Sequence, residues 1–236
     1  MREPADTETK DASGRYDLPL AAAYIRGALA GTDHPLITQP FDVLDREMCE
    51  DLLALARERG IDLHHLKRFD ELPRVRAVLG FLRGIRPAEL LDIGSGRGAF
   101  LFPFLRAFPG TPVTSVEKDE RRADMLDAVS RGGFDRLSAV RADICSWDAP
   151  DAAYDVVTML EVLEHIPDVR SAVLNACRIA RRYVAVTVPN KPDDNPEHIH
   201  LLTKPVLTGL FKAAGCADLK FDAVPGHLIL FAKKGA

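Results

Sequence analysis

The chain lacks the features that would place it in a membrane or outside the cell. No apolar run approaches the roughly 20 residues that a membrane-spanning helix needs, and the first fifteen residues carry no apolar core of a secretion signal. The four cysteines, at positions 49, 145, 177 and 216, form no CxxC pair, which argues against a disulfide framework or a thiolate zinc site. We therefore expect a soluble, cytoplasmic protein without a membrane partner.

An excess of basic charge is also missing. The chain has 31 Lys and Arg against 35 Asp and Glu, so its net charge of -4 gives no sign of binding to a phosphate backbone. A local basic face would still allow a nucleic-acid partner. No internal repeat or low-complexity segment occurs, and 236 residues with 47% hydrophobic content are typical of one compact domain with a small appendage. The sequence does not indicate the oligomeric state.

Three segments are expected along the chain. Residues 1–15 carry too little apolar mass to pack and predict a mobile tail. Residues 16–72 predict a helical cap, in which 41–60 has apolar residues at helical spacing and ends at Gly60. Residues 73–236 form the third segment, which begins with a helix from Pro73 to Gly84.

The third segment predicts an α/β fold. From residue 88 onward, five short apolar runs alternate with helical patterns, which favours a mostly parallel sheet with helices on both faces. Pro103 falls inside the first of these helices and should bend it or delay its start. The last two apolar runs are separated only by the turn Pro225-Gly226, so we expect an antiparallel hairpin at the sheet edge.

A glycine-rich turn follows the first predicted strand. In the run LLDIGSGRGA, Gly94, Ser95 and Gly96 lie between a buried strand and a helix, where main-chain N–H groups can approach a nucleotide-like ligand. The spacing also satisfies the dinucleotide fingerprint of hydride-transfer enzymes. An NAD(P)-dependent oxidoreductase is therefore an alternative, although no Tyr-x-x-x-Lys pair accompanies the turn.

Acidic residues follow three successive predicted strands and favour a different ligand. Asp92 precedes the turn and could face a cationic ligand group, while Glu117 ends the second strand and could accept both hydroxyls of a ribose. Asp143 ends the third strand and could accept from an adenine amino group, while Ile144 covers a ring face. The carboxyl ends of parallel strands share one edge, so these side chains should line one site.

This ordered set resembles the class I S-adenosylmethionine-dependent methyltransferases over about residues 73–234. The resemblance implies a Rossmann-like, seven-stranded sheet that ends in an antiparallel hairpin, and S-adenosylmethionine as cofactor. Its cofactor-binding residues would be Asp92, Gly94, Ser95, Gly96, Glu117, Asp143 and Ile144.

A second group of polar residues follows the fourth and fifth predicted strands. If residues 161–165 form a helical turn, Glu161, Glu164 and His165 share a face. His198, with His200 nearby, follows the fifth strand, which ends at the same sheet edge. Two carboxylates and two imidazoles would suit Mg²⁺, Mn²⁺ or Zn²⁺.

Two resemblances assign this second group differently. The sequence EVLEHI is similar to small-molecule O-methyltransferases of the ubiquinone-biosynthesis type, in which such residues shape the acceptor pocket. It also resembles the small-RNA 3′-terminal 2′-O-methyltransferases, which would imply that Glu161, Glu164, His165 and His198 bind a divalent cation. The aromatic and arginine-rich setting of that family's later histidine is absent, since IHLLT follows His198.

We therefore predict methyl transfer to a hydroxyl of a small molecule, with metal-assisted RNA methylation as the alternative. Methyl transfer from a sulfonium depends mainly on positioning and on a dry site. Glu161, His165 and His198 are the candidate catalytic residues, because a histidine could act as general base near pH 7. The residues leave the identity of the acceptor open.

Overall fold

The computed structural model describes residues 16–66, 72–192 and 194–235. The predicted mobile tail therefore lies outside the described residues. Among the described helices, none combines the length and the apolar character needed to cross a membrane. The chain forms two compact units, one of Met1–Phe69 and Asp124–Ser138, the other of Asp70–Ala123 and Ala139–Ala236.

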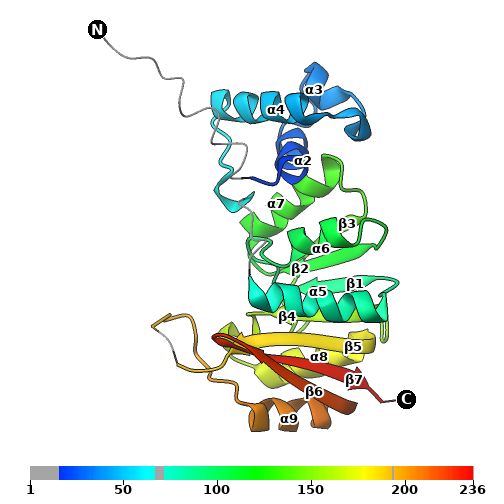
Figure 1. The fold of residues 1–236 in the computed structure, drawn as a ribbon, viewed down its shortest axis with the longest axis vertical. Helices are drawn as coiled ribbons and strands as arrows, with labels where there is room; N and C mark the ends of the chain where they lie inside the picture. The colour runs from blue at the N-terminus through cyan, green and yellow to red at the C-terminus, as the bar shows by residue number, and fades with distance from the viewer. Residues whose placement is uncertain (1–15, 67–71, 193, 236) are drawn as a thin grey trace. The chain divides into compact units, whose positions relative to one another are not determined.

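The second unit holds most of a seven-stranded sheet (Figure 1). Its order is β3-β2-β1-β4-β5-β7-β6. The strands are β1 (Leu90–Ile93), β2 (Val113–Glu117), β3 (Leu137–Arg141), β4 (Tyr154–Leu160), β5 (Ala180–Pro189), β6 (Cys216–Val224) and β7 (His227–Lys234). Strand β1 pairs parallel with β2 and β4, and β4 pairs parallel with β5, whereas β7 is antiparallel to β5 and β6. The predicted α/β class and the terminal hairpin are confirmed.

Strand register places the residues that follow the strands at one edge. Asp92 of β1 lies opposite Ser115 of β2 and Thr158 of β4. Farther along, β5 pairs with β7 so that Pro189 lies opposite His227. The ends of β1, β2, β4 and β5 and the start of β7 therefore frame the candidate site.

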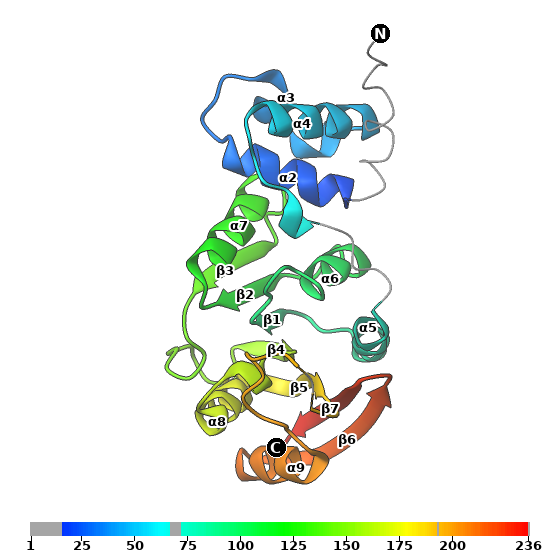
Figure 2. The ribbon, with the colours of Figure 1, turned by 90° about the vertical axis from the view of Figure 1, so that its left-hand side faces the viewer.

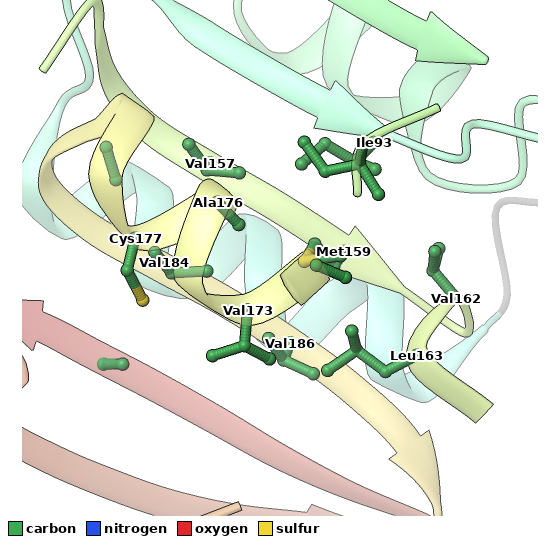
Figure 3. Close-up of a cluster of buried hydrophobic side chains, with 14 of the residues drawn as sticks. Ile93, Val157, Met159, Val162, Leu163, Val173, Ala176, Cys177, Val184 and Val186 are labelled. Carbon is green, nitrogen blue, oxygen red and sulfur yellow. The ribbon is translucent and has the colours of Figure 1, made fainter. Parts of the chain in front are cut away.

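Helices cover both faces of this sheet. In Figure 2, α8 (Val169–Ile179) lies on one face, and α5 (Pro73–Ile85) and α6 (Leu101–Ala107) lie on the other. The side chain of Asp168 accepts from the Ser171 N–H and caps α8, whose apolar face packs against β4 and β5 (Figure 3). Helix α6 begins at Leu101, so Pro103 falls in its first turn, as the expected delayed start requires. The last helix, α9 (Lys204–Ala213), contacts β6.

The first unit contains the N-terminal helices. They are α2 (Leu18–Ala28), α3 (Pro35–Thr38), the 3₁₀ turns η1 (Phe41–Val43) and η2 (His64–Leu66), and α4 (Arg46–Glu58). The predicted helix 41–60 is shorter than expected, because the Asp45 side chain accepts from the Met48 N–H and starts α4 at Arg46. No helix was predicted over the residues of α2.

Close glycine contacts join α2 to α7 (Glu120–Arg131) within the first unit. A Cβ on Gly27 would lie 1.8 Å from the carbonyl oxygen of Ala128, and one on Gly132 would lie 1.7 Å from that of Ala23. Neither distance is physically possible, so both positions require glycine. The backbones of the two segments of this unit are therefore in direct contact at these glycines.

Candidate active site

The glycine-rich turn after β1 adopts the left-handed backbone that its sequence predicts. Gly94, Gly96 and Gly98 have φ angles of 67°, 56° and 76°. A Cβ on Gly94 would lie 2.8 Å from a methyl carbon of Val162, so the turn and the segment after β4 are in contact. The N–H groups of Gly94, Gly96 and Gly98 donate within the chain, to the Val116 carbonyl, the Glu117 carboxylate and the Ser95 carbonyl.

Asp92 lies beneath this turn. Its carboxylate is 2% exposed and accepts hydrogen bonds from Ser95 Oγ at 2.5 Å and Thr158 Oγ1 at 2.7 Å. Burial raises the pKa of Asp92 from 3.8 to about 7, and the two hydroxyl donors only partly oppose this shift. The oxygens of Asp92 accept from hydroxyls of the chain, and the expected contact between Asp92 and a ligand stays a prediction.

Glu117 fixes the shape of the glycine turn from the end of β2. One carboxylate oxygen accepts from the Gly96 N–H at 2.9 Å, and the other accepts from the Asp119 N–H at 3.2 Å. The side chain is 5% exposed. Each oxygen retains acceptor capacity, so the bidentate contact with a ribose that the sequence suggests is compatible with this arrangement.

Asp143 is paired with a lysine that the sequence analysis did not single out. Lys118 Nζ lies 2.7 Å from one oxygen of Asp143, and the Cys145 N–H donates to the other at 2.9 Å. The lysine contact, followed by the backbone donor, lowers the pKa of Asp143. Lys118 directly follows Glu117 at the end of β2. This place beside the predicted cofactor residues is the sequence feature from which Lys118 could have been predicted to lie at the site. The neighbouring Ile144 is buried in the core of the second unit.

These residues border a cavity of about 710 Å³ within the second unit. One part of its lining comes from the predicted cofactor residues Gly94, Gly96, Glu117, Asp143 and Ile144. The other part includes Glu161, Val162, His165, Ile166, Glu197 and Ile199. Among the described residues, Asp92 and Ser95 support the turn without lining this cavity.

Glu161 does not join the other three candidate metal ligands. The expected helical turn 161–165 is replaced by a 3₁₀ turn at Leu163–His165, and Glu161 has a left-handed φ of 58°. Its carboxylate instead accepts from Thr187 Oγ1 at 2.8 Å and lies 3.0 Å from His227 Nε2. The expected four-residue cluster is corrected to three residues, because Glu161 is directed toward β5 and β7.

Glu164, His165 and His198 do come together. One ligand atom from each lies within 4.8 Å of the others, and Glu164 is fully buried. The Nδ1 of His165 lies 3.0 Å from the carbonyl oxygen of Glu197, which can only accept, so in the neutral ring Nε2 is the nitrogen with the lone pair. This set offers one oxygen and two nitrogens to a cation.

His200, the possible substitute for His198, is engaged elsewhere. Its Nε2 lies 3.1 Å from the carbonyl oxygen of Ile166. The contact ties the segment after β5 to the segment after β4. His198 therefore remains the histidine of this segment that approaches Glu164 and His165.

Comparisons with known proteins agree with this geometry. A family model described as a methyltransferase domain matches residues 63–220. The chain is 33% identical over 116 residues to a ubiquinone biosynthesis O-methyltransferase of Idiomarina loihiensis, which is 46% of either protein. It is 29% identical over 141 residues to a probable S-adenosylmethionine-dependent methyltransferase of Mycobacterium tuberculosis, which is 56% of this chain and 49% of that protein. The matches thus span about half the length of these two relatives.

A solved structure shares the fold. It is the 1,6-didemethyltoxoflavin-N1-methyltransferase of Burkholderia thailandensis, with bound 1,6-didemethyltoxoflavin and S-adenosylhomocysteine. The TM-score is 0.57 at 20% identity, over 78% of this chain and 86% of that one. This similarity shows the shared fold, and the family match favours methyl transfer over the hydride transfer that the glycine spacing alone would allow.

Proposed function

The chain belongs to the methyltransferase domain family and is an S-adenosylmethionine-dependent methyltransferase, and from this we propose that it methylates a hydroxyl of a small molecule. The curated relative of Idiomarina loihiensis is an O-methyltransferase by name. The observation that carries the proposal is the single cavity that joins the glycine turn and Glu117 to Glu161 and His165.

The residues present fit the cofactor. The turn leaves space at Gly96, where a Cβ would meet nothing closer than 3.8 Å, and Glu117 stands at the end of β2 with acceptor capacity left on both oxygens. Gly94, Gly96, Glu117, Asp143 and Ile144 would hold it, with Asp92 and Ser95 supporting the turn from below. When bound, the cofactor supplies an electrophilic methyl group.

The acceptor end of the cavity combines titratable and apolar groups. Glu161 and His165 can accept a proton, and Val162, Ile166 and Ile199 offer apolar surface. A small molecule with a hydroxyl group and an apolar body suits this lining. Exclusion of water and alignment of the hydroxyl would provide most of the rate enhancement.

A divalent cation at Glu164, His165 and His198 is the second candidate feature of this site. The three ligand atoms lie close enough to share one ion. A bound cation would lower the pKa of an acceptor hydroxyl, which would favour the alternative of RNA 2′-O-methylation. His165 is the one of these three residues that lines the cavity, so an acceptor in the cavity would approach a bound ion from the side of His165.

The proposed function can be tested in two steps. Calorimetry should detect binding of S-adenosylhomocysteine to the full chain and no comparable binding of NAD. Transfer of labelled methyl from S-adenosylmethionine should then be measured on catechol, simple phenols, aliphatic hydroxy acids and a short RNA. Methylation of a small hydroxyl compound supports the proposal, whereas methylation restricted to the RNA would refute it.

A further inference from the structure

Charged residues are distributed unevenly between the two ends of the cavity. At the cofactor end, the segment after β2 contributes acids and bases together, and Lys118 Nζ lies 2.7 Å from Asp143 Oδ2. The acceptor end is formed by the segments after β4 and β5. Its lining contains the acids Glu161 and Glu197 but, among the described residues, no lysine or arginine. Because glutamate is normally ionised near neutral pH, negative charge is in excess at the acceptor end.

The charge of Glu161 is compensated from behind the lining. Arg74 Nε, from the first turn of α5, lies 3.9 Å from Oε1 of Glu161, and Thr187 Oγ1 donates to the same oxygen at 2.8 Å. Nε2 of His227 lies 3.0 Å from the other oxygen. The side chains of Arg74 and Glu161 are only 19% and 21% exposed, so water weakens their attraction less than it would at the surface. Glu161 therefore adds little open charge to the cavity.

The backbone around Glu197 is held in place beside the cavity. The Glu197 N–H donates to Oδ1 of Asn195 at 3.0 Å, and the Glu197 carbonyl oxygen lies 3.0 Å from Nδ1 of His165. Two residues later, the Ile199 N–H donates to the carbonyl oxygen of Glu164 at 3.0 Å. These contacts attach the segment after β5 to the turn that follows β4, and none of them uses the Glu197 side chain.

The carboxylate of Glu197 is the open negative charge at this end. It is exposed and lines the cavity, and within the described part of the chain it has no hydrogen bond or ion pair. Its neighbours in the lining, Ile166 and Ile199, are apolar and offer no compensating charge. An acceptor with an ammonium group would find a complementary partner here, whereas a carboxylate or a phosphate would meet like charge.

We propose that Glu197 selects acceptors that carry an ammonium group in addition to the hydroxyl that is methylated. This inference rests on the proposed function and names a substrate class for the same cavity. The ammonium group would pair with Glu197, and the apolar part of the acceptor would contact Ile166 and Ile199. A neutral acceptor would lack the ion pair, and an anionic acceptor would be disfavoured by repulsion. Glu197 is thus a specificity-determining residue that takes no part in bond making.

Binding of three catechols that differ in charge tests this preference. Dopamine, ethylcatechol and dihydroxyphenylacetate share one ring and carry an ammonium, a neutral and a carboxylate side chain. Calorimetry would use the full chain saturated with S-adenosylhomocysteine, in EDTA so that no cation contributes charge. We expect affinity to fall in the order given, by about 5-fold at each step, as for an exposed ion pair. High salt should reduce the differences.

Variants of Glu197 assign the preference to this carboxylate. Glu197→Gln should bring the three affinities within about 2-fold of one another, and Glu197→Lys should reverse their order. Asp194→Asn removes a negative charge from the same segment, at an exposed acid that does not line the cavity, and should leave the order intact. An order that persists in Glu197→Gln would overturn the inference, as would dopamine binding no tighter than dihydroxyphenylacetate to the unaltered chain.

Methyl transfer to the same three catechols separates this inference from the proposed function. The values of kcat/KM should follow the order of affinity, with kcat nearly constant, because the ion pair acts equally on the bound acceptor and on the transition state. Equal kcat/KM for the three compounds would overturn the inference alone. Failure of the unaltered chain to methylate these or any other hydroxyl compound would instead count against the proposed function.

Discussion

Replacement of Asp92 by asparagine should make the stability of the protein less dependent on pH. Burial holds the pKa of this carboxyl at about 7 in the folded chain, against an ordinary value of 3.8. Between these values the unfolded chain has released the proton and the folded chain has not, so folding is progressively disfavoured as pH rises from 3.8 to 7. The stability contribution is complete below pH 3.8 and lost above pH 7.

The size of the effect follows from the shift. Each pKa unit corresponds to about 1.4 kcal/mol, so the interval from 3.8 to about 7 gives about 4 kcal/mol. Asparagine can accept from Thr158 through its oxygen and donate to Ser95 Oγ through its nitrogen, since the Ser95 hydroxyl can then donate to Ser115 instead, and the amide does not titrate. The stability of Asp92→Asn relative to the unaltered chain should therefore improve by about 4 kcal/mol between pH 4 and pH 8.

Urea unfolding at several pH values would measure this difference. Trp147 is the single tryptophan of the chain and lies in the second unit with Asp92, so its fluorescence reports on the relevant unit. Asp148→Asn, at an exposed acid in the same unit, controls for the loss of one negative charge. A free-energy difference between Asp92→Asn and the unaltered chain that stays constant with pH would show that burial does not govern this carboxyl.

Three further outcomes are expected. Glu117→Ala should weaken binding of S-adenosylhomocysteine in calorimetry by about 1.5–3 kcal/mol, because hydrogen bonds to a charged acceptor are lost, and unchanged affinity would remove Glu117 from the cofactor site. Gly132→Ala should destabilise the first unit by about 1–3 kcal/mol in urea unfolding, because its Cβ meets the Ala23 carbonyl, whereas Gly80→Ala, which meets nothing within 4 Å, should not destabilise the protein. If a cation assists catalysis, EDTA should abolish methyl transfer, Mg²⁺, Mn²⁺ or Zn²⁺ should restore it, and His198→Ala should respond to neither; activity indifferent to EDTA would argue against the metal.

The parts of the fold with a local sequence signal could be predicted. Alternation of buried strands and helices gives the α/β class, and the turn Pro225-Gly226 between two apolar runs gives the hairpin. The glycines after β1 permit a left-handed backbone, and Gly94, Gly96 and Gly98 adopt it. Each of these features depends on residues that are close together in the sequence.

The predictions that were wrong concern the start of α4, which a capping side chain decides, and the position of Glu161, which contacts with distant residues decide. Asp45 caps α4 and so shortens the helix expected from residue 41, although its side chain was a readable signal. Glu161 leaves the helical turn because Thr187 and His227 hold its carboxylate, and neither contact has a trace in the sequence around it. The placement of β7 between β5 and β6 creates the second contact, and only the register of the folded sheet reveals it.

The composition of the first unit determines when it can fold during synthesis and where the chain can be shortened. It consists of two stretches that are separate in the sequence, and the glycine contacts of α2 lie on the second stretch. During synthesis from the N-terminus, α2 and α4 are complete long before Ala128 and Gly132 exist, so this unit can close only after residue 138 has been added. A shortened chain that begins near Leu72 would expose the α7 backbone that Gly27 and Ala23 cover. The N-terminal helices are therefore not an independent module, and exchange of this segment between related proteins would succeed only if α7 were exchanged with it.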